Sequence, residues 1–340
     1  TDTFTIVLDA EPASDVVISI ASNDTGEATV TSTLTFTNAN WDTPQTVTVT
    51  GVDDNLVDGT INSTVTVAID PDNSEDGFDG LSSSSVAITT ADDDVAGFTI
   101  AETDGSTAVA ESGTTDTFTI VLNAQPASDV VLSISSGDTG ETTTTSTLTF
   151  TNTNWDTPQT VTVTGVDDNI IDGTISSTLT IAVIDAISDD NFDGVADQTV
   201  TATTTDDDVA GFTVSETGGS TSVAESGTTD TFTIVLDAEP ASDVVFNVSS
   251  NDTGESTVTS TLTFTNANWD TPQTVTVTGV DDNLVDGTIS STVTITVDDA
   301  NSDNDFDAVA NQTVTATTTD DDTAGFTIAE TGGSTSVDES

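Results

Sequence analysis

The sequence predicts an all-β protein built from tandem antiparallel β-sandwiches. Two observations support this prediction. The motif TDTFTIVL recurs from Thr1, Thr115 and Thr229, and Thr or Ser alternates with Val, Ile, Leu or Phe over much of the chain. A period of two places every second side chain on one face, as in an antiparallel strand with one buried face. No stretch has the apolar spacing of an amphipathic helix.

The repeat is 114 residues long, because 115 − 1 and 229 − 115 both give 114. A unit of this size corresponds to a whole domain rather than a solenoid coil. We therefore expect a repeat 1 that lacks its first strand (1–94), complete repeats 2 and 3 (95–208 and 209–322), and a segment matching the first strand of a further repeat (323–340). Either the chain is a window from a longer array, or segment 323–340 is a donor strand that completes the first domain of another subunit.

Repeat 2 contains seven expected strands, separated by segments rich in Gly, Pro, Asn and Asp. They are 98–101 with a continuation at 108–110, then 115–122, 129–135, 145–151, 159–166, 175–184 and 199–205. Phe118, Ile120 and Leu122 mark the face expected to be buried. Seven short strands at this spacing predict an immunoglobulin-like β-sandwich.

The composition restricts the chemistry of the chain. It has 60 Asp and Glu residues and no Lys, Arg, His or Cys, so its formal net charge is −60. Such a chain repels nucleic acids and anionic lipids, and cations are its natural partners. Disulfides and the usual zinc, copper and haem ligands are excluded, together with the commonest general base and the thiol nucleophile. We therefore expect no enzymatic activity, and the lack of a long apolar run gives no membrane insertion in this segment.

Strand direction predicts where the acidic residues meet. If consecutive strands reverse between opposite ends of the sandwich, seven carboxylates of repeat 2 reach the same end. They are Glu111, Asp167, Asp168, Asp172, Asp206, Asp207 and Asp208. Two like charges about 4 Å apart repel by about 1 kcal/mol in water and about 4 kcal/mol at an effective dielectric constant near 20. The loops must therefore either stay open and solvated or enclose hard cations.

Calcium is the cation that fits this arrangement best, because Ca²⁺ accepts about 6–8 oxygen ligands in a flexible geometry, whereas Mg²⁺ tends to keep its waters. The 114-residue spacing extends the set of candidate ligands to the other repeats. In repeat 1 they are Asp53, Asp54, Asp58, Asp92, Asp93 and Asp94; in repeat 3 they are Glu225, Asp281, Asp282, Asp286, Asp320, Asp321 and Asp322; and Glu339 follows in the last segment. The alternative is a solvated acidic surface, as in halophilic proteins, without a specific metal site.

Each repeat resembles a Calx-β module, the calcium-binding β-sandwich of sodium–calcium exchangers and of many large bacterial surface proteins. The matching residues are Val109-Ala110-Glu111, Leu148-Thr149-Phe150, the run from Val161 to Asp168, and Asp206-Asp207-Asp208. The resemblance implies calcium ligands at Glu111, Asp167, Asp168 and Asp206–Asp208. Two features depart from the family pattern: Asp172 stands where a Glu is usual, and the family's Asp-Tyr pair has no match. The sequence TLTFTNANWDTPQTVTVTGVDDN is more similar to the tandem repeats of giant bacterial adhesins and surface filaments than to the animal exchanger domain.

The other end of each sandwich is expected to face the preceding repeat, because Gly211 and Phe212 follow Asp208 almost directly and leave no flexible linker. In repeat 2 this end comprises the loops 123–128, 152–159 and 188–197. We expect Trp155 to close the core and Phe192 to be buried. Asp189, Asp190 and Asp193 either supply carboxylates to the junction or lie in a solvated loop.

These observations favour a structural role over catalysis. The leading hypothesis is a repeat region in the stalk of a secreted bacterial adhesin or surface filament, in which Ca²⁺ stiffens the junctions between neighbouring repeats of one chain. A second hypothesis is a self-assembling sheath, surface-layer or fibre subunit, in which identical chains associate, including by strand donation. A third is a glycan- or ice-binding module that uses Thr arrays such as Thr142–Thr145, although strands ordinarily place Thr on their exposed faces.

Overall fold

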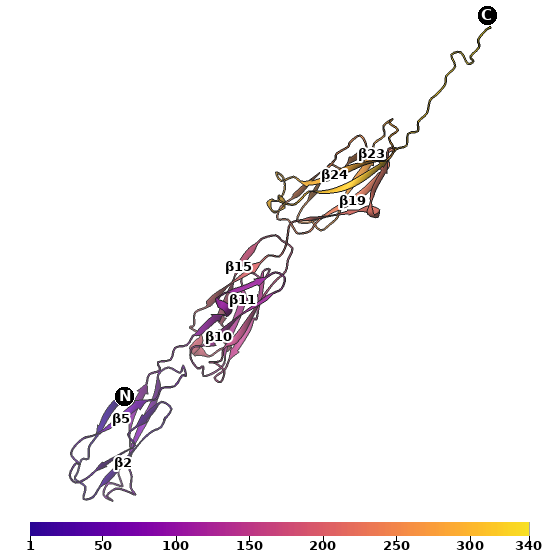
Figure 1. The fold of residues 1–340 in the computed structure, drawn as a ribbon. Helices are drawn as coiled ribbons and strands as arrows, with labels where there is room; N and C mark the ends of the chain where they lie inside the picture. The colour runs from indigo at the N-terminus through magenta and orange to yellow at the C-terminus, as the bar shows by residue number, and fades with distance from the viewer. Residues whose placement is uncertain (340) are drawn as a thin grey trace. The chain divides into compact units, whose positions relative to one another are not determined.

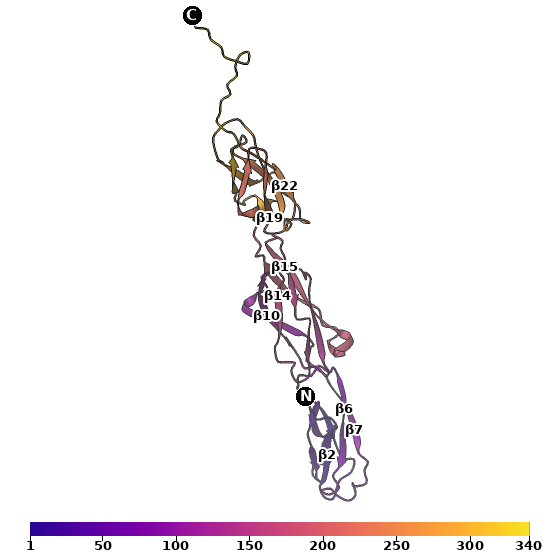
Figure 2. The same cartoon turned by 90° about the vertical axis from the view of Figure 1, so that its right-hand side faces the viewer.

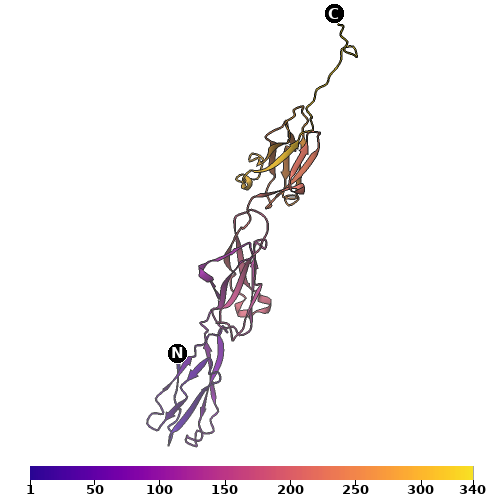
Figure 3. The same cartoon turned by 45° about the vertical axis from the view of Figure 1, so that its right-hand side comes forward.

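The computed structural model describes residues 1–339 and confirms an all-β chain of tandem β-sandwiches (Figure 1). The helical elements in this range are single 3₁₀ turns: η1 (Thr103–Gly105), η2 (Asp185–Ile187), η3 (Asp190–Phe192), η4 (Thr217–Gly219) and η5 (Asn304–Phe306). None of the helical turns within residues 1–339 has the length or apolar character that crossing a membrane requires. In all three views, the segment that follows the last strand leaves its sandwich as an extended chain (Figures 2 and 3).

The chain forms two compact units. Unit 1 consists of Thr1–Val109, Thr114–Gly165 and Ser176–Thr203, and unit 2 consists of Ala110–Gly113, Val166–Ile175 and Thr204–Ser340. Unit 1 therefore holds repeat 1 and most of the repeat 2 sandwich. Unit 2 holds repeat 3 together with the three acidic segments of repeat 2.

Repeat 1 has seven strands in two sheets. They are β1 (Asp2–Ile6), β2 (Val16–Ser22), β3 (Ala28–Val30), β4 (Thr33–Phe36), β5 (Gln45–Gly51), β6 (Ile61–Ile69) and β7 (Ser84–Thr90). One sheet has the order β1-β5-β3 and the other has the order β4-β2-β6-β7.

Repeat 2 has nine strands. They are β8 (Phe98–Glu102), β9 (Thr107–Ala110), β10 (Thr115–Leu122), β11 (Val130–Ser136), β12 (Thr142–Thr144), β13 (Thr147–Phe150), β14 (Gln159–Gly165), β15 (Thr174–Val183) and β16 (Gln198–Thr205). The sheet orders are β12-β14-β10-β8 and β13-β11-β15-β16-β9.

Repeat 3 reproduces this plan. Its strands are β17 (Phe212–Glu216), β18 (Thr221–Ala224), β19 (Thr229–Leu236), β20 (Val244–Ser250), β21 (Ser256–Val258), β22 (Thr261–Phe264), β23 (Gln273–Gly279), β24 (Ile289–Val297) and β25 (Gln312–Thr319). The orders are β17-β19-β23-β21 and β18-β25-β24-β20-β22. Nearly all pairings are antiparallel, and β18 runs parallel to β25.

The alternation in the sequence is the alternation of burial in the strands. Along β19, Phe232, Ile234 and Leu236 are buried, whereas Thr233 and Val235 between them are partly exposed. The two inner faces enclose the core of repeat 3, where the Phe246 ring lies edge-on to Phe212 and Phe264 at centroid distances of 4.7 and 5.9 Å. Burying one such side chain contributes about 1.5–3 kcal/mol, so each core is the main source of stability for its repeat.

One of the expected strands is split in the structure. The first strand of a complete repeat becomes β17 and β18, which belong to different sheets and are joined by a turn containing Gly218 (φ 76°) and Gly219 (φ 84°). The expected strand 145–151 corresponds to β13, and the short strand β12, which precedes it in the other sheet, was not expected. A period-2 pattern shows which face of a strand is buried but not which sheet the strand joins, so it does not reveal the switch between sheets.

Candidate metal centre

The strand order of repeat 3 brings four segments to one end of the sandwich, here called the acidic end. They are the turn between β18 and β19 with Glu225, the segment 251–255 before β21, the loop 280–288 between β23 and β24, and residues 320–322 after β25. The expected convergence of the segments that carry Glu225, the loop 280–288 and residues 320–322 is therefore observed in repeat 3, and the segment 251–255 is an unexpected addition.

Backbone hydrogen bonds fix Glu225 beside the end of β25. The Glu225 N–H donates to the Thr319 carbonyl at 3.1 Å, and the Gly227 N–H donates to the Ala224 carbonyl at 3.1 Å. Gly227 adopts φ 83°, a left-handed conformation that glycine accepts without strain. The tight turn thus places the Glu225 side chain directly next to the aspartate triplet.

Two groups of carboxylates meet at this end. The Asp322 cluster consists of Glu225, Asp282 and Asp322, and the Glu255 cluster consists of Glu225, Glu255 and Asp286; within each cluster, one oxygen from every residue lies within 4.8 Å of the others. Glu225 belongs to both clusters and is only 1% exposed, and Glu255 is 7% exposed. One buried carboxylate therefore links two sets of oxygens.

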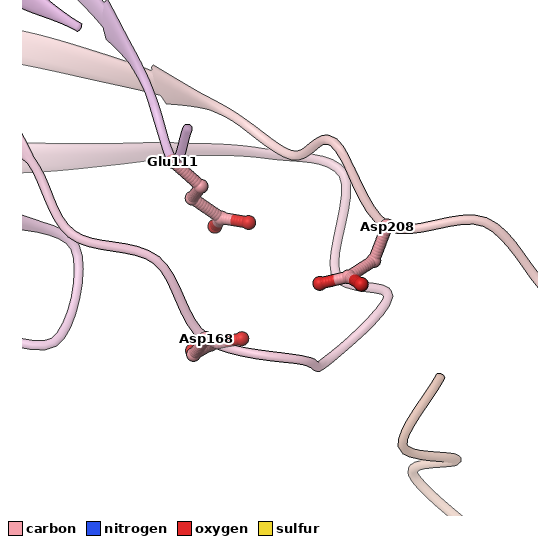
Figure 4. Close-up of side chains that lie close together, drawn as sticks. All are labelled: Glu111, Asp168 and Asp208. Atoms are coloured by element: carbon pink, nitrogen blue, oxygen red, sulfur yellow. The ribbon is translucent and has the colours of Figure 1, made fainter. Parts of the chain in front are cut away.

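Repeat 2 has the counterpart of the Asp322 cluster, formed by Glu111, Asp168 and Asp208. In Figure 4 these three side chains come from three separate segments and direct their carboxylates toward a common space. Glu111 is buried, whereas Asp168 and Asp208 are partly exposed. The same arrangement thus occurs twice in the chain.

The three aspartates of each triplet have different roles. The Asp320 carboxylate accepts hydrogen bonds from the Gly287 N–H (2.8 Å) and the Asp322 N–H (2.7 Å), and these bonds lower its pKa. Asp206 accepts the equivalent bonds from Gly173 (2.9 Å) and Asp208 (2.7 Å). The first aspartate therefore orders the loop, the middle one is exposed, and the third turns toward the cluster.

Burial raises the pKa of the carboxyls at the centre of the site. For Glu225 the cause is burial, followed by the charges of Asp320 and Asp282. Burial and Asp286 act in the same way on Glu255, and burial and Asp320 act on Asp322. No positive side chain is available to offset these charges, because the chain has no Lys, Arg or His.

In repeat 3, three buried side-chain oxygens have no hydrogen-bond partner among the described residues: Glu225 Oε2, Glu255 Oε2 and Asp322 Oδ2. Buried polar atoms are nearly always paired, and a buried carboxylate is costly without a compensating charge. Carboxylate oxygens from several loops are also the ligands that Ca²⁺ prefers. The donor set therefore fits a hard divalent cation.

The expected ligands of repeats 2 and 3 have three different outcomes. Glu111, Asp168, Asp208, Glu225, Asp282, Asp286 and Asp322 belong to a cluster, and the repeat 2 counterpart of Asp286 is Asp172. Asp206 and Asp320 belong to no cluster among residues 1–339, and their carboxylates accept backbone N–H groups instead. Asp167, Asp207, Asp281 and Asp321 are exposed and belong to no cluster among residues 1–339. Glu339 is also exposed, in the extended segment after β25, and no cluster in this range includes it.

In repeat 1 the acidic residues line a small crevice. Asp53, Asp54, Asp58, Asp92, Asp93 and Asp94 surround it together with Glu27. Burial and then Asp58 raise the pKa of Glu27, whereas hydrogen bonds from the Gly59 and Asp94 amides lower that of Asp92. The local electrostatics of repeat 1 therefore resemble those of repeat 3.

The sequence analysis did not identify one ligand position, occupied by Glu27, Glu141 and Glu255 at 114-residue spacing. In repeat 2, Glu141 lies in the turn between the third and fourth expected strands. The same parity rule places that turn at the acidic end, so it could have been found. This position carries a single Glu among Asp, Thr and Gly, without a run of acidic residues to mark it.

The opposite end of repeat 2 is built differently. The Asp189 carboxylate accepts the Ser128 N–H (2.7 Å) and the Asn191 N–H (3.0 Å), so it caps the η3 turn. Asp190 is exposed, and burial followed by Asp185 raises the pKa of Asp193. Phe192 is fully buried and Trp155 packs against the core, as expected.

Comparisons with known proteins complete the description. No protein-family model and no curated sequence matches the chain. Among solved structures, the calcium binding domain CBD12 of CALX1.1 is 13% identical over 58% of this chain and 80% of its own (TM-score 0.26). Domains 4 and 5 of the S-layer protein SbsC are 18% identical over 55% and 76%, respectively (TM-score 0.26). The candidate metal site is therefore defined by the geometry of this chain alone.

Proposed function

We propose that the acidic end of each repeat binds Ca²⁺, and that the repeats form a calcium-dependent structural segment of a secreted bacterial surface protein such as an adhesin stalk or a filament. The observation that carries the proposal is the set of buried carboxylate oxygens of Glu225, Glu255 and Asp322, which have no partner in the described part of the chain, in a sequence without a basic residue. Such a group of charges needs a cation to be stable.

The residues divide naturally between two ions in repeat 3. Glu225, Asp282 and Asp322 would hold one, and Glu225, Glu255 and Asp286 would hold the other, with Glu225 shared. Backbone carbonyls and waters complete calcium coordination in proteins, which needs about 6–8 oxygens. When bound, Ca²⁺ supplies the positive charge that the side chains lack.

The mechanical consequence follows from the position of the clusters. Without the ion, like charges on several loops of one end repel one another, and the loops loosen. With it, the loops are held together next to the start of the following repeat. Calcium-binding modules that work outside cells have dissociation constants of about 10⁻⁴–10⁻³ M. We expect dissociation constants in this range for the proposed extracellular segment.

Isothermal titration calorimetry on the full chain after chelation tests the proposal. We expect saturable Ca²⁺ binding with more than one ion per chain, a higher melting temperature in the bound state, and a much weaker response to Mg²⁺, which keeps its own waters. If Ca²⁺ produces neither binding heat nor a shift in melting temperature, the proposal is wrong.

A second candidate function is side-by-side assembly into a sheath or surface layer. The strands carry five of the 60 acidic residues, namely Asp2, Glu102, Asp116, Glu216 and Asp230. The outer face of the β19–β23 pair bears threonines directly opposite one another, at Thr231–Thr276 and Thr233–Thr274. These uncharged faces favour contact between identical chains.

Sedimentation velocity tests this second function. Assembly that requires Ca²⁺ and is abolished by Thr231→Asp or Thr276→Asp would support it, with the loop substitution Asp321→Asn as a control. A chain that remains a monomer at all concentrations of protein and Ca²⁺ would exclude it.

A further inference from the structure

The acidic loop of repeat 2 contacts repeat 3 through its outer edge. The Asn169 carbonyl accepts the Glu239 N–H at 2.7 Å, and Ile170 forms an isolated parallel bridge with Glu239. The Ile171 side chain packs against the core of repeat 3. All of these residues belong to unit 2.

The same contact occurs within unit 1, between repeats 1 and 2. The Gln125 N–H donates to the Asn55 carbonyl at 2.7 Å, and the Val57 N–H donates to the Gln125 carbonyl at 3.0 Å. Val57 is buried in the core of repeat 2, and its carbonyl accepts the Asn191 side-chain amide at 2.7 Å. Docking of this loop onto the next repeat is therefore a repeated feature.

The docking residues and the acidic residues belong to one short segment. In repeat 2, Asp168 directly precedes Asn169, and Asp172 directly follows Ile171. The Asp168 carboxylate also accepts the Ile170 N–H at 2.7 Å. A displacement at the docking edge must therefore displace the carboxylates as well.

Repeat 3 has the same loop without this support. Its sequence GVDDNLVDG matches GVDDNIIDG of repeat 2. Leu284 is 63% exposed and Val285 is 58% exposed, and no described residue covers them, whereas Ile170 is 37% exposed. Repeats 2 and 3 thus present equivalent acidic residues on a docked and an undocked loop.

We propose that docking onto the following repeat pre-organises the acidic loop, so that this loop binds Ca²⁺ more tightly when it is docked, as in repeat 2, than when it is undocked, as among the described residues of repeat 3. This inference rests on the proposed function. A loop that is already held in place loses less freedom when it binds a ligand. Because coupling between two binding events is reciprocal, Ca²⁺ also strengthens the docking. Couplings of this kind commonly change an affinity by about 5–150-fold.

The test uses the full chain and hydrogen–deuterium exchange measured at increasing free Ca²⁺, because exchange reports each loop separately. We expect the segment 166–173 to become protected at a lower Ca²⁺ concentration than 280–288, by about tenfold, which lies in the lower part of that range. Protection of the Glu239 amide should rise together with that of 166–173.

Two variants distinguish coupling from simple binding. Ile171→Asn removes the docking side chain and should shift the midpoint of 166–173 to that of 280–288. The matched substitution Val285→Asn lies on the undocked loop and should change neither midpoint. Circular dichroism without Ca²⁺ checks that both variants fold, and Ile171→Ala replaces Ile171→Asn if that variant does not.

The outcomes are separable. If Ca²⁺ protects neither loop, the proposed function itself fails. If both loops respond with equal midpoints, or if Ile171→Asn leaves the midpoint of 166–173 unchanged, Ca²⁺ binds and the coupling is wrong.

Discussion

At the scale of single residues, Glu225 determines the character of the site. Its carboxylate is buried, belongs to both clusters of repeat 3, and has an oxygen that finds no hydrogen-bond partner within residues 1–339. Ordinary surface carboxylates gain little from a cation because water already solvates them. A buried carboxylate shared by two sets of oxygens responds strongly to the presence or absence of a counter-charge.

The substitution Glu225→Gln tests this role, because it keeps the shape of the side chain and removes its charge. We expect it to raise the melting temperature in Ca²⁺-free buffer, since a buried like charge is removed, and to lower Ca²⁺ affinity in repeat 3 by at least about tenfold, since ligand charge sets affinity in such sites. Calorimetry in both conditions measures the two effects. The control is Asp321→Asn, which removes the same charge at an exposed position and should change neither the melting temperature nor the Ca²⁺ affinity. A Glu225→Gln variant that loses stability without Ca²⁺ would contradict this view of the site.

The raised pKa values give the stability a specific pH dependence. The pKa values of Glu225 and Glu255 are raised above the ordinary value of 4.5, and the pKa of Asp322 is raised above 3.8. Their stabilising contribution is present below those ordinary values and is lost as the pH rises through the folded-state pKa. The pKa of Asp320 is lowered from 3.8, so its stabilising contribution is fully present above that value and is lost as the pH falls through the folded-state pKa.

Without divalent cations, the melting temperature should therefore rise as the pH falls from neutral toward 4.5, and fall again below 3.8. With saturating Ca²⁺ the first trend should reverse, because protons and the cation compete for the same oxygens. Melting curves over this range, with and without EGTA, provide the measurement. Identical profiles in the two buffers would show that these carboxyls do not bind the ion.

At the scale of elements, strand positions were largely predictable and sheet membership was not. The buried positions Phe118, Ile120 and Leu122 follow from period-2 alternation, and the convergence of Glu225 and Asp322 follows from strand direction alone. The switch of the first strand between sheets depends on backbone conformation in a turn of two or three residues, which hydrophobic periodicity does not encode. Glu255 joins the site because the additional short strand β21 begins directly after it.

The second half of the first strand, β18, needs a glycine opposite it. A Cβ atom on Gly279 would lie 2.1 Å from the Ala224 carbonyl oxygen, which is backbone and cannot rotate away. Gly279→Ala should therefore displace β18 together with Glu225 and cost about 1–3 kcal/mol, as overpacking usually does. In repeat 1, a Cβ on the equivalent Gly51 would meet only the Thr90 methyl group at 3.8 Å. Scanning calorimetry should show a lowered transition for Gly279→Ala and none for Gly51→Ala; equal effects would indicate that β18 does not set this requirement.

The contact of the repeat 1 loop with repeat 2 and the contact of the repeat 2 loop with repeat 3 differ by one side chain. Asn191 donates its amide to the Val57 carbonyl, and the equivalent position in repeat 3 is Asp305, which lines a crevice with Ile171 and Asp208. The substitution Asp305→Asn supplies the missing donor and removes a negative charge from this crevice. We expect greater protection of the Glu239 amide from hydrogen exchange, by about fivefold if one net hydrogen bond of about 1 kcal/mol is gained. Asp307→Asn, which also removes a charge from this loop, is the control. Reduced protection in Asp305→Asn would contradict the expected hydrogen bond.

At the scale of the whole molecule, the charge of −60 is concentrated in loops, since the strands contain only five acidic residues among those described. The sheets therefore fold around an almost uncharged alternation of Thr, Ser and aliphatic side chains. Repulsion is strongest at the loop ends, where carboxylates from several segments meet. This repulsion can be reduced in two ways: by salt, which screens all charges, or by Ca²⁺ bound at the clusters. Only the second would make the stability of the protein depend on calcium.

Salt and calcium separate these two descriptions. Monovalent salt screens all charges alike, over about 10 Å at 0.1 M, and should raise the melting temperature gradually when EGTA is present. Ca²⁺ acts at the clusters around Glu111 and Glu225, so it should raise the melting temperature at concentrations that barely change the ionic strength. Once Ca²⁺ is bound, the dependence on NaCl should shrink, because the strongest repulsion is already neutralised. The control is Mg²⁺ at matched ionic strength. If NaCl, Mg²⁺ and Ca²⁺ give the same melting temperature at equal ionic strength, the acidic ends are solvated surfaces that only repel one another, and the buried oxygens of Glu225 and Glu255 hold no cation.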